Sequence, residues 1–67
     1  MSNYEYMMDK LNKAWCYAHI VMEAPEVAEK ISEIQNSLMR LEGNDKEIAK
    51  FYYRRYIPFK ESYFLYF

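Results

Sequence analysis

Three residues whose side chains can bind metals or act as nucleophile and base lie close together in the first apolar segment. Cys16, His19 and Glu23 are spaced by three and four positions. In a helix this spacing places them on one face, with Asp9 and Asn12 on the same side. Thiolate, imidazole and carboxylate are all zinc ligands, but a closed site needs ligands from a second element. Since the chain has no other Cys or His, we expect no metal site and no cofactor.

Cys16 and His19 also have the residue types of a nucleophile and its general base. Covalent catalysis further requires an oxyanion hole and a cleft that holds the substrate. The chain has a single glycine with which to build such loops. The sequence therefore predicts a protein that is not an enzyme.

The segment from Lys50 to Lys60 combines cations with aromatic rings. Cations neutralise phosphates and rings stack on bases, so this composition is found on surfaces that bind single-stranded nucleic acid. On a helix, Lys46, Lys50 and Arg54 share one row at a spacing of four. Arg55 points instead toward the apolar stripe, where it could pair with an acid of another helix or of a partner. The same rings can equally form a core whose rim consists of solvated cations.

Aromatic residues are concentrated at the carboxyl end of the chain. Nine of the thirteen rings lie in residues 51–67. At roughly 150–250 Å² per ring, the thirteen rings together offer more surface than a small core readily absorbs. We therefore predict that this end of the chain binds a partner. The residues expected to contact it are Tyr52, Tyr53, Arg54, Arg55, Tyr56, Phe59, Tyr63, Phe64, Tyr66 and Phe67.

Length and composition limit the remaining classes of function. With 67 residues, the chain (1–67) is expected to form one small domain with a thin core. A net charge of −1 argues against a general attraction to nucleic acid or anionic membranes, although residues 44–67 are net positive. The longest near-apolar run, residues 14–22, is too short to cross a membrane, which takes about 20 residues. The single cysteine and the lack of a signal-peptide pattern favour the cytoplasm.

Apolar periodicity predicts a first helix over residues 3–23, capped by Ser2 or Asn3. A second apolar face, formed by Tyr6, Tyr17 and Ile20, lies beside the main stripe. A helix with two apolar faces usually contacts two neighbours, one of which could belong to another chain. The main stripe consists of Tyr4, Met7, Met8, Leu11, Ala14, Trp15, Ala18, Val21 and Met22.

A second helix is predicted from Pro25 to about Leu41, since proline suits the first position of a helix. Its narrow stripe favours close antiparallel packing. Gly43 stands where a left-handed residue is needed to end this helix. The stripe consists of Val27, Ile31, Ile34, Leu38 and Leu41.

Asn44 is predicted to cap a third helix with an apolar stripe of Ile48, Tyr52 and Tyr56. Pro58 should stop or kink that helix at Ile57. For the residues after Pro58 a helix is favoured over a strand, because no second strand is present for pairing. An intermolecular strand is the alternative.

The sequence thus predicts an all-α domain of three helices built on an αα-hairpin, with a short aromatic C-terminal helix or irregular tail after Pro58. Its expected function is that of a small regulator or inhibitor that binds a larger protein through aromatic and methionine-rich surface. By analogy of size and composition, such chains serve as accessory factors of phages and mobile elements. Two alternatives stay open: a nucleic-acid-binding protein that uses Lys50–Lys60, and a homodimeric structural module in which the rings form a shared core.

Overall fold

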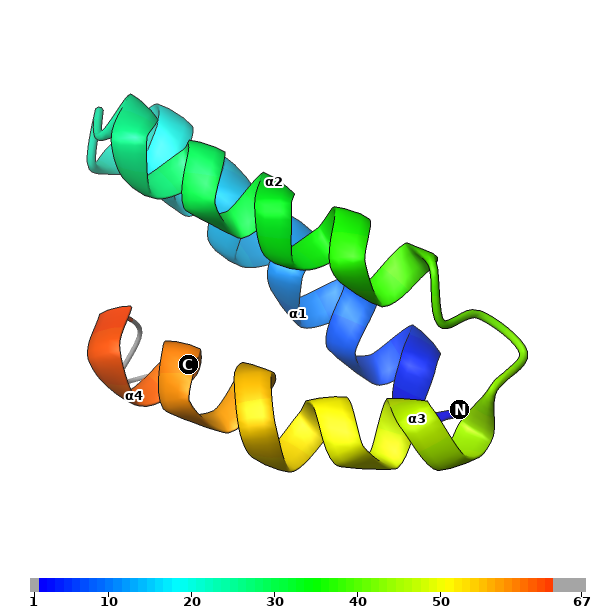
Figure 1. Cartoon of the computed structure of the whole chain (residues 1–67). Coiled ribbons are helices and arrows are strands. Elements are labelled where there is room, and N and C mark those ends of the chain that lie inside the picture. Colours follow the sequence, from blue (N-terminus) through cyan, green and yellow to red (C-terminus); the bar gives the residue numbers. More distant parts are fainter. Residues whose placement is uncertain (1, 64–67) are drawn as a thin grey trace.

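The computed structural model describes residues 2–63, and its helices follow one another along three rods (Figure 1). The first rod consists of α1 (Asn3–Cys16) and the π-helical turn η1 (Tyr17–Val21), and the second is α2 (Pro25–Met39). The third rod contains α3 (Asp45–Phe51), a second π-helical turn η2 (Tyr52–Tyr56) and α4 (Ile57–Tyr63). Residues 2–63 contain no strand, and the predicted all-α fold is confirmed.

Local sequence signals explain where the helices begin and end. The Ser2 hydroxyl accepts a hydrogen bond from the Glu5 backbone N–H at 3.1 Å, and the Asn44 side chain accepts one from the Glu47 N–H at 3.2 Å. Both are N-caps that satisfy a helical donor which would otherwise lack a partner. Pro25 opens α2, and Gly43 has the left-handed φ of 88° that the chain reversal before α3 requires.

The first two rods form an antiparallel hairpin and lie side by side along most of their length (Figure 1). Small side chains at Ala14, Ala18 and Ala28 are buried between them, which lets the two backbones approach closely. Outside this contact the Gln35 side-chain amide donates to the Asn12 side-chain oxygen at 2.6 Å. The predicted hairpin is therefore present, with its apolar seam inside and an amide pair at its edge.

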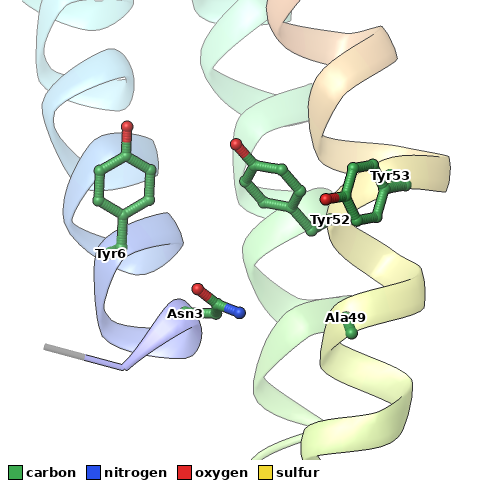
Figure 2. Close-up of a pocket in the computed structure, with 5 residues that line it drawn as sticks. All are labelled: Asn3, Tyr6, Ala49, Tyr52 and Tyr53. Atoms are coloured by element: carbon green, nitrogen blue, oxygen red, sulfur yellow. The ribbon is translucent and has the colours of Figure 1, made fainter.

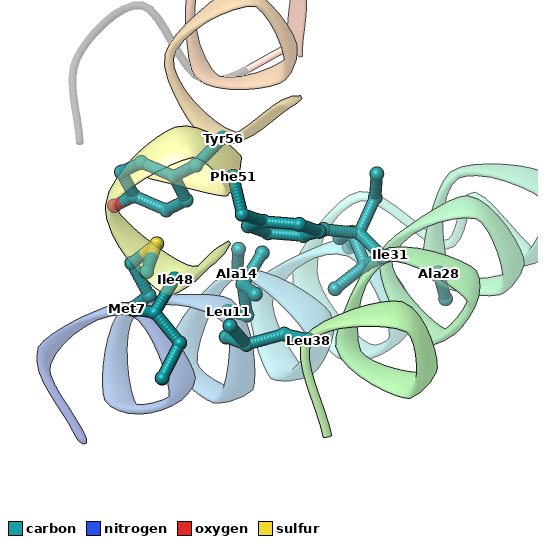
Figure 3. Packing of buried hydrophobic residues seen from close by; sticks show 11 residues of the cluster. Met7, Leu11, Ala14, Ala28, Ile31, Leu38, Ile48, Phe51 and Tyr56 are labelled. Atoms are coloured by element: carbon teal, nitrogen blue, oxygen red, sulfur yellow. The ribbon is translucent and has the colours of Figure 1, made fainter. Parts of the chain in front are cut away.

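The third rod closes the core from one side of the hairpin. Phe51 and Tyr56 extend from this rod toward the hairpin (Figure 3), and Ile48 is buried beside α1. The start of α1 lies beside the start of α3 (Figure 1). Within the described part of the chain, the buried core consists of Met7, Leu11, Ala14, Ala18, Ala28, Ile31, Ile34, Leu38, Ile48, Phe51 and Tyr56.

Two residues of the predicted first stripe neither belong to this core nor pack against it. Val21 and Met22 have 63% and 44% of their surface exposed, whereas the sequence pattern places them inside. In the π turn η1 each residue advances less around the helix axis than in an α-helix, which rotates Val21 away from the seam. The last buried layer of the hairpin contains Ala18 and Ala28, so Met22 lies beyond the end of the core.

The sequence predicts that Pro58 stops or kinks the third helix at Ile57. The structure shows no stop there, but a change from π-helical to α-helical geometry at Ile57. In an α-helix the proline ring would clash with the carbonyl of Arg54. The structure places the wider π turn η2 immediately before it, and the Ile57 N–H donates to the Tyr52 carbonyl, five residues back. This shift of register gives the proline ring room, and α4 continues to Tyr63. The helical alternative for the segment after Pro58 is thus confirmed up to that residue.

Candidate partner-binding surface

The residues predicted to contact a partner fall into distinct environments along the third rod. Tyr53 has 75% of its surface exposed, and the neighbouring arginines are exposed as well. Tyr52 and Phe59 are half-buried, whereas Tyr56 belongs to the core with 4% of its surface exposed. Tyr63 is the last residue of α4. The other predicted contacts, Phe64, Tyr66 and Phe67, lie outside the described residues.

Ring contacts within η2 hold the exposed Tyr53 in place. Tyr52 stacks on Tyr56 with ring centroids 5.4 Å apart, and Tyr53 meets the Tyr52 ring edge-on at 5.1 Å. Both arrangements are favourable for aromatic pairs. Because Tyr56 is anchored in the core, this series of contacts connects an exposed ring to the rigid interior.

A groove of about 370 Å³ lies between the start of α1 and the third rod (Figure 2). We call it the tyrosine groove. The Tyr52 ring extends from the third rod toward α1, and Tyr6 stands on the α1 side (Figure 2). Its lining is uncharged and consists of Asn3, Tyr6, Ala49, Tyr52 and Tyr53.

Tyr56, on which Tyr52 of the groove stacks, has a raised pKa. Burial, together with the nearby hydroxyls of Tyr6 and Tyr52, raises the pKa of Tyr56 to about 12. At the outer edge the Lys10 ammonium lies 5.7 Å from the centre of the Tyr6 ring, within range of a cation–π interaction. The groove therefore offers aromatic walls, phenolic and amide hydrogen-bonding groups, and one positive charge at its edge.

A second, smaller hollow of about 200 Å³ lies on another flank of the third rod. We call it the basic hollow. Arg55 lies over the Phe51 ring at 5.7 Å, and the Lys50 ammonium forms an exposed ion pair with Glu47 at 3.5 Å. The lining of the hollow therefore contains three cations, one carboxylate and two apolar side chains. The lining consists of Leu41, Glu47, Lys50, Phe51, Arg54 and Arg55.

The Cys16, His19 and Glu23 set does not form a site in the structure. The His19 ring stacks on Trp15 with centroids 4.8 Å apart, and Cys16 is an exposed free thiol. Glu23 lies beyond the end of η1 in the turn to α2. Across residues 2–63, no three Cys, His, Asp or Glu side chains gather as metal ligands would.

Sequence reasoning missed part of the surface that the structure assembles. Asn3 and Ala49 line the tyrosine groove, but neither residue type signals binding on its own. Tyr6 was recognisable from the second apolar face of the first helix. The exposed group of Ile20, Val21 and Met22 at the end of the hairpin follows from the π turn, which the periodicity does not reveal.

Comparison with family models, curated proteins and solved structures finds no match to this chain. Among the helices that the structure describes, none has both the length and the apolar character needed to cross a lipid bilayer.

Proposed function

We propose that this chain is a small, non-enzymatic regulator or inhibitor that binds a larger protein in the cytoplasm. The observation that carries the proposal is Tyr53, which has 75% of its surface exposed at the edge of the tyrosine groove. A large ring held on a rigid helix costs little conformational entropy when it binds. Exposed tyrosines and arginines of this kind contribute much of the binding energy at protein interfaces.

The arrangement of the groove supports a protein as the partner. Its walls belong to Tyr6 of α1 and to Tyr52 and Tyr53 of the third rod, so the groove exists only when the two rods are packed together. Phenolic hydroxyls and the Asn3 amide can donate to backbone carbonyls, while the rings provide apolar contact. These are the properties of a surface that accepts one segment of a folded or extended polypeptide.

Nucleic-acid binding through Lys50–Lys60 is less well supported by the geometry. Glu47 lies beside the cation row and pairs with Lys50, which reduces the positive charge available to phosphates. The chain as a whole has a net charge of −1. Nucleic acid is therefore retained as an outcome that the experiments must distinguish.

Site-specific photo-crosslinking tests the proposal. A benzophenone amino acid at position 53 should produce a covalent adduct with one protein in cells of the native source. The same residue at Glu33, an exposed position on α2 that lines neither hollow, is the control and should yield no such adduct.

The adduct at position 53 should be lost when Tyr6 and Tyr52 are both changed to alanine. Circular dichroism must show that this variant remains helical. Equal adducts at positions 53 and 33, or an adduct that contains nucleic acid, would contradict the proposal. An adduct with a second copy of the chain would support the homodimeric alternative instead.

A further inference from the structure

The basic hollow contains cations that the described part of the chain leaves uncompensated. Arg54 and Arg55 are exposed, and neither forms an ion pair with any residue from 2 to 63. Lys50 is only partly neutralised by Glu47, since both side chains remain about half exposed. Two adjacent guanidinium groups with free donors are suited to carboxylates, which they can bind in bidentate fashion.

Beneath these cations the floor of the hollow is apolar. Leu41 is half-buried in the turn after α2, and Phe51 belongs to the core. A hollow of about 200 Å³ is large enough for one aliphatic side chain but not for an extended ligand. The combination of cationic edge and apolar floor matches a short segment in which acidic and aliphatic residues alternate.

We infer that the basic hollow binds an acidic segment of the partner protein. One or two of its carboxylates contact Arg54 and Arg55, and an aliphatic side chain packs against the half-buried Leu41 and the small exposed part of Phe51. This inference rests on the proposed function, since it specifies the chemistry of the same partner. It also accounts for Arg55, whose position in the sequence predicts pairing with an acid.

The hollow itself argues for a polypeptide rather than a nucleic acid. Phe51 has 6% of its surface exposed and Arg55 already lies over its ring, so no face is free for a base to stack on. The Glu47 carboxylate repels phosphates and peptide carboxylates alike, so it does not distinguish the two ligands. The lack of a free ring face and the apolar floor are the features that favour a peptide over a nucleic acid.

Titration of the isotope-labelled full chain, followed by NMR, tests the inference. The probe is a short peptide that alternates Asp or Glu with Leu, and its matched control replaces the acids by Asn and Gln. The acidic peptide should shift the backbone amide signals of Lys50, Phe51, Arg54 and Arg55, while the amide peptide should not. The affinity should fall steeply with added salt.

Variants with reversed charge locate the effect. Arg54→Glu with Arg55→Glu should weaken binding of the acidic peptide about tenfold or more. Lys13→Glu with Lys30→Glu changes the net charge equally at exposed positions that line neither hollow, and should leave the affinity nearly unchanged. If the glutamate variant does not fold, Arg54→Gln with Arg55→Gln provides the same comparison with a smaller change in charge.

Three results would overturn the inference. The first is a lack of signal shifts with the acidic peptide, and the second is equal weakening by both charge-reversed variants. The third is tighter binding of an oligothymidylate than of the peptide at the same amides. If the crosslink at position 53 still captures a protein in any of these cases, the proposed function stands and only the acidic character of its segment is wrong.

Discussion

Glu23 has a left-handed backbone conformation, with φ of 51°, in the turn between η1 and α2. Among the described residues it is the only non-glycine residue with positive φ. The turn is closed by the Ala24 N–H, which donates to the Ala18 carbonyl at 2.9 Å. A β-carbon makes this conformation unfavourable by roughly 1–2 kcal/mol, so the turn persists at a cost in stability.

We expect Glu23→Gly to raise the free energy of unfolding by about 0.5–1 kcal/mol. Glycine removes the steric strain, although its greater freedom in the unfolded chain offsets part of the gain. Urea denaturation followed by circular dichroism measures the change.

Gly43→Ala is the control with the opposite expected sign. Gly43 has φ of 88°, and an added β-carbon would meet no other atom within 4 Å, so only the backbone strain is tested. This substitution should destabilise the chain by about 1 kcal/mol. Changes of the same sign would contradict the strain argument.

The raised pKa of Tyr56 makes the free energy of unfolding depend on pH in the alkaline range. Burial first, and then the neighbouring Tyr6 and Tyr52 hydroxyls, raise its pKa from 10.0 to about 12 in the folded chain. The unfolded chain therefore loses this proton at lower pH than the folded chain does. The stability that depends on the neutral phenol is complete below pH 10 and is lost as the pH rises toward 12.

Replacement of Tyr56 by phenylalanine should flatten the decline of stability above pH 10. The difference in unfolding free energy between the native chain and the variant should change by at most about 2 kcal/mol across this range. Urea denaturation at a series of pH values measures it. Tyr53→Phe is the control, since solvent reaches that ring in the folded and the unfolded chain alike. Parallel pH curves for the native chain and Tyr56→Phe would refute the argument.

At the scale of the elements, the helices of the hairpin carry apolar side chains both in the core and on the exposed surface. Ile31 is fully buried against α1, whereas Ile20 in η1 has 69% of its surface exposed. The hairpin therefore has one isoleucine inside the core and one on its surface. Removal of one methyl group from each isoleucine compares the contribution of a buried methyl group to stability with that of an exposed one.

Ile31→Val should lower the free energy of unfolding by about 0.5–1.5 kcal/mol, because it leaves a small cavity in a packed core. Ile20→Val should stay within about 0.5 kcal/mol of the native chain. Thermal and urea denaturation of both variants provide the comparison. A larger loss at Ile20 than at Ile31 would show that the exposed end of the hairpin is covered in solution.

The whole molecule is slightly elongated, with dimensions of 34 × 20 × 18 Å. Among residues 2–63 the exposed large apolar side chains are dispersed over three places. Tyr17, Ile20, Val21 and Met22 lie at the end of the hairpin, Met39 at the end of α2, and Tyr6 and Tyr53 at the tyrosine groove. A stable protein interface buries about 800 Å² on each partner. The four adjoining side chains at the end of the hairpin are too few to supply it.

We therefore expect the purified chain to sediment as an 8.3 kDa monomer at micromolar concentration. Sedimentation velocity over a range of concentrations measures this directly. A concentration-dependent species of twice the mass would favour the homodimeric alternative. In that case Ile20→Ser should restore the monomer if the hairpin end is the interface, and Tyr53→Ser if the third rod is.

The sequence by itself determined the helical class, the boundaries at Ser2, Pro25, Gly43 and Asn44, and the centre of the second helix's seam at Ile31, Ile34 and Leu38. These features depend on local chemistry: capping hydrogen bonds, the fixed φ of proline, and apolar spacing along one helix. The sequence also identified Tyr53 and Arg54 as surface candidates, because aromatic and cationic side chains occur together there.

Only the tertiary structure decided how deeply each aromatic residue of the third rod is buried. The predicted stripe of Ile48, Tyr52 and Tyr56 already separated Tyr56 from the exposed Tyr53, but it did not distinguish the half-buried Tyr52 from Tyr56, which has 4% of its surface exposed. That difference depends on how the third rod, with its π turn η2, packs on the hairpin, and apolar spacing along one helix does not specify it. The tyrosine groove likewise needs Tyr6 and Tyr52 from opposite ends of the chain, and packing alone brings them together.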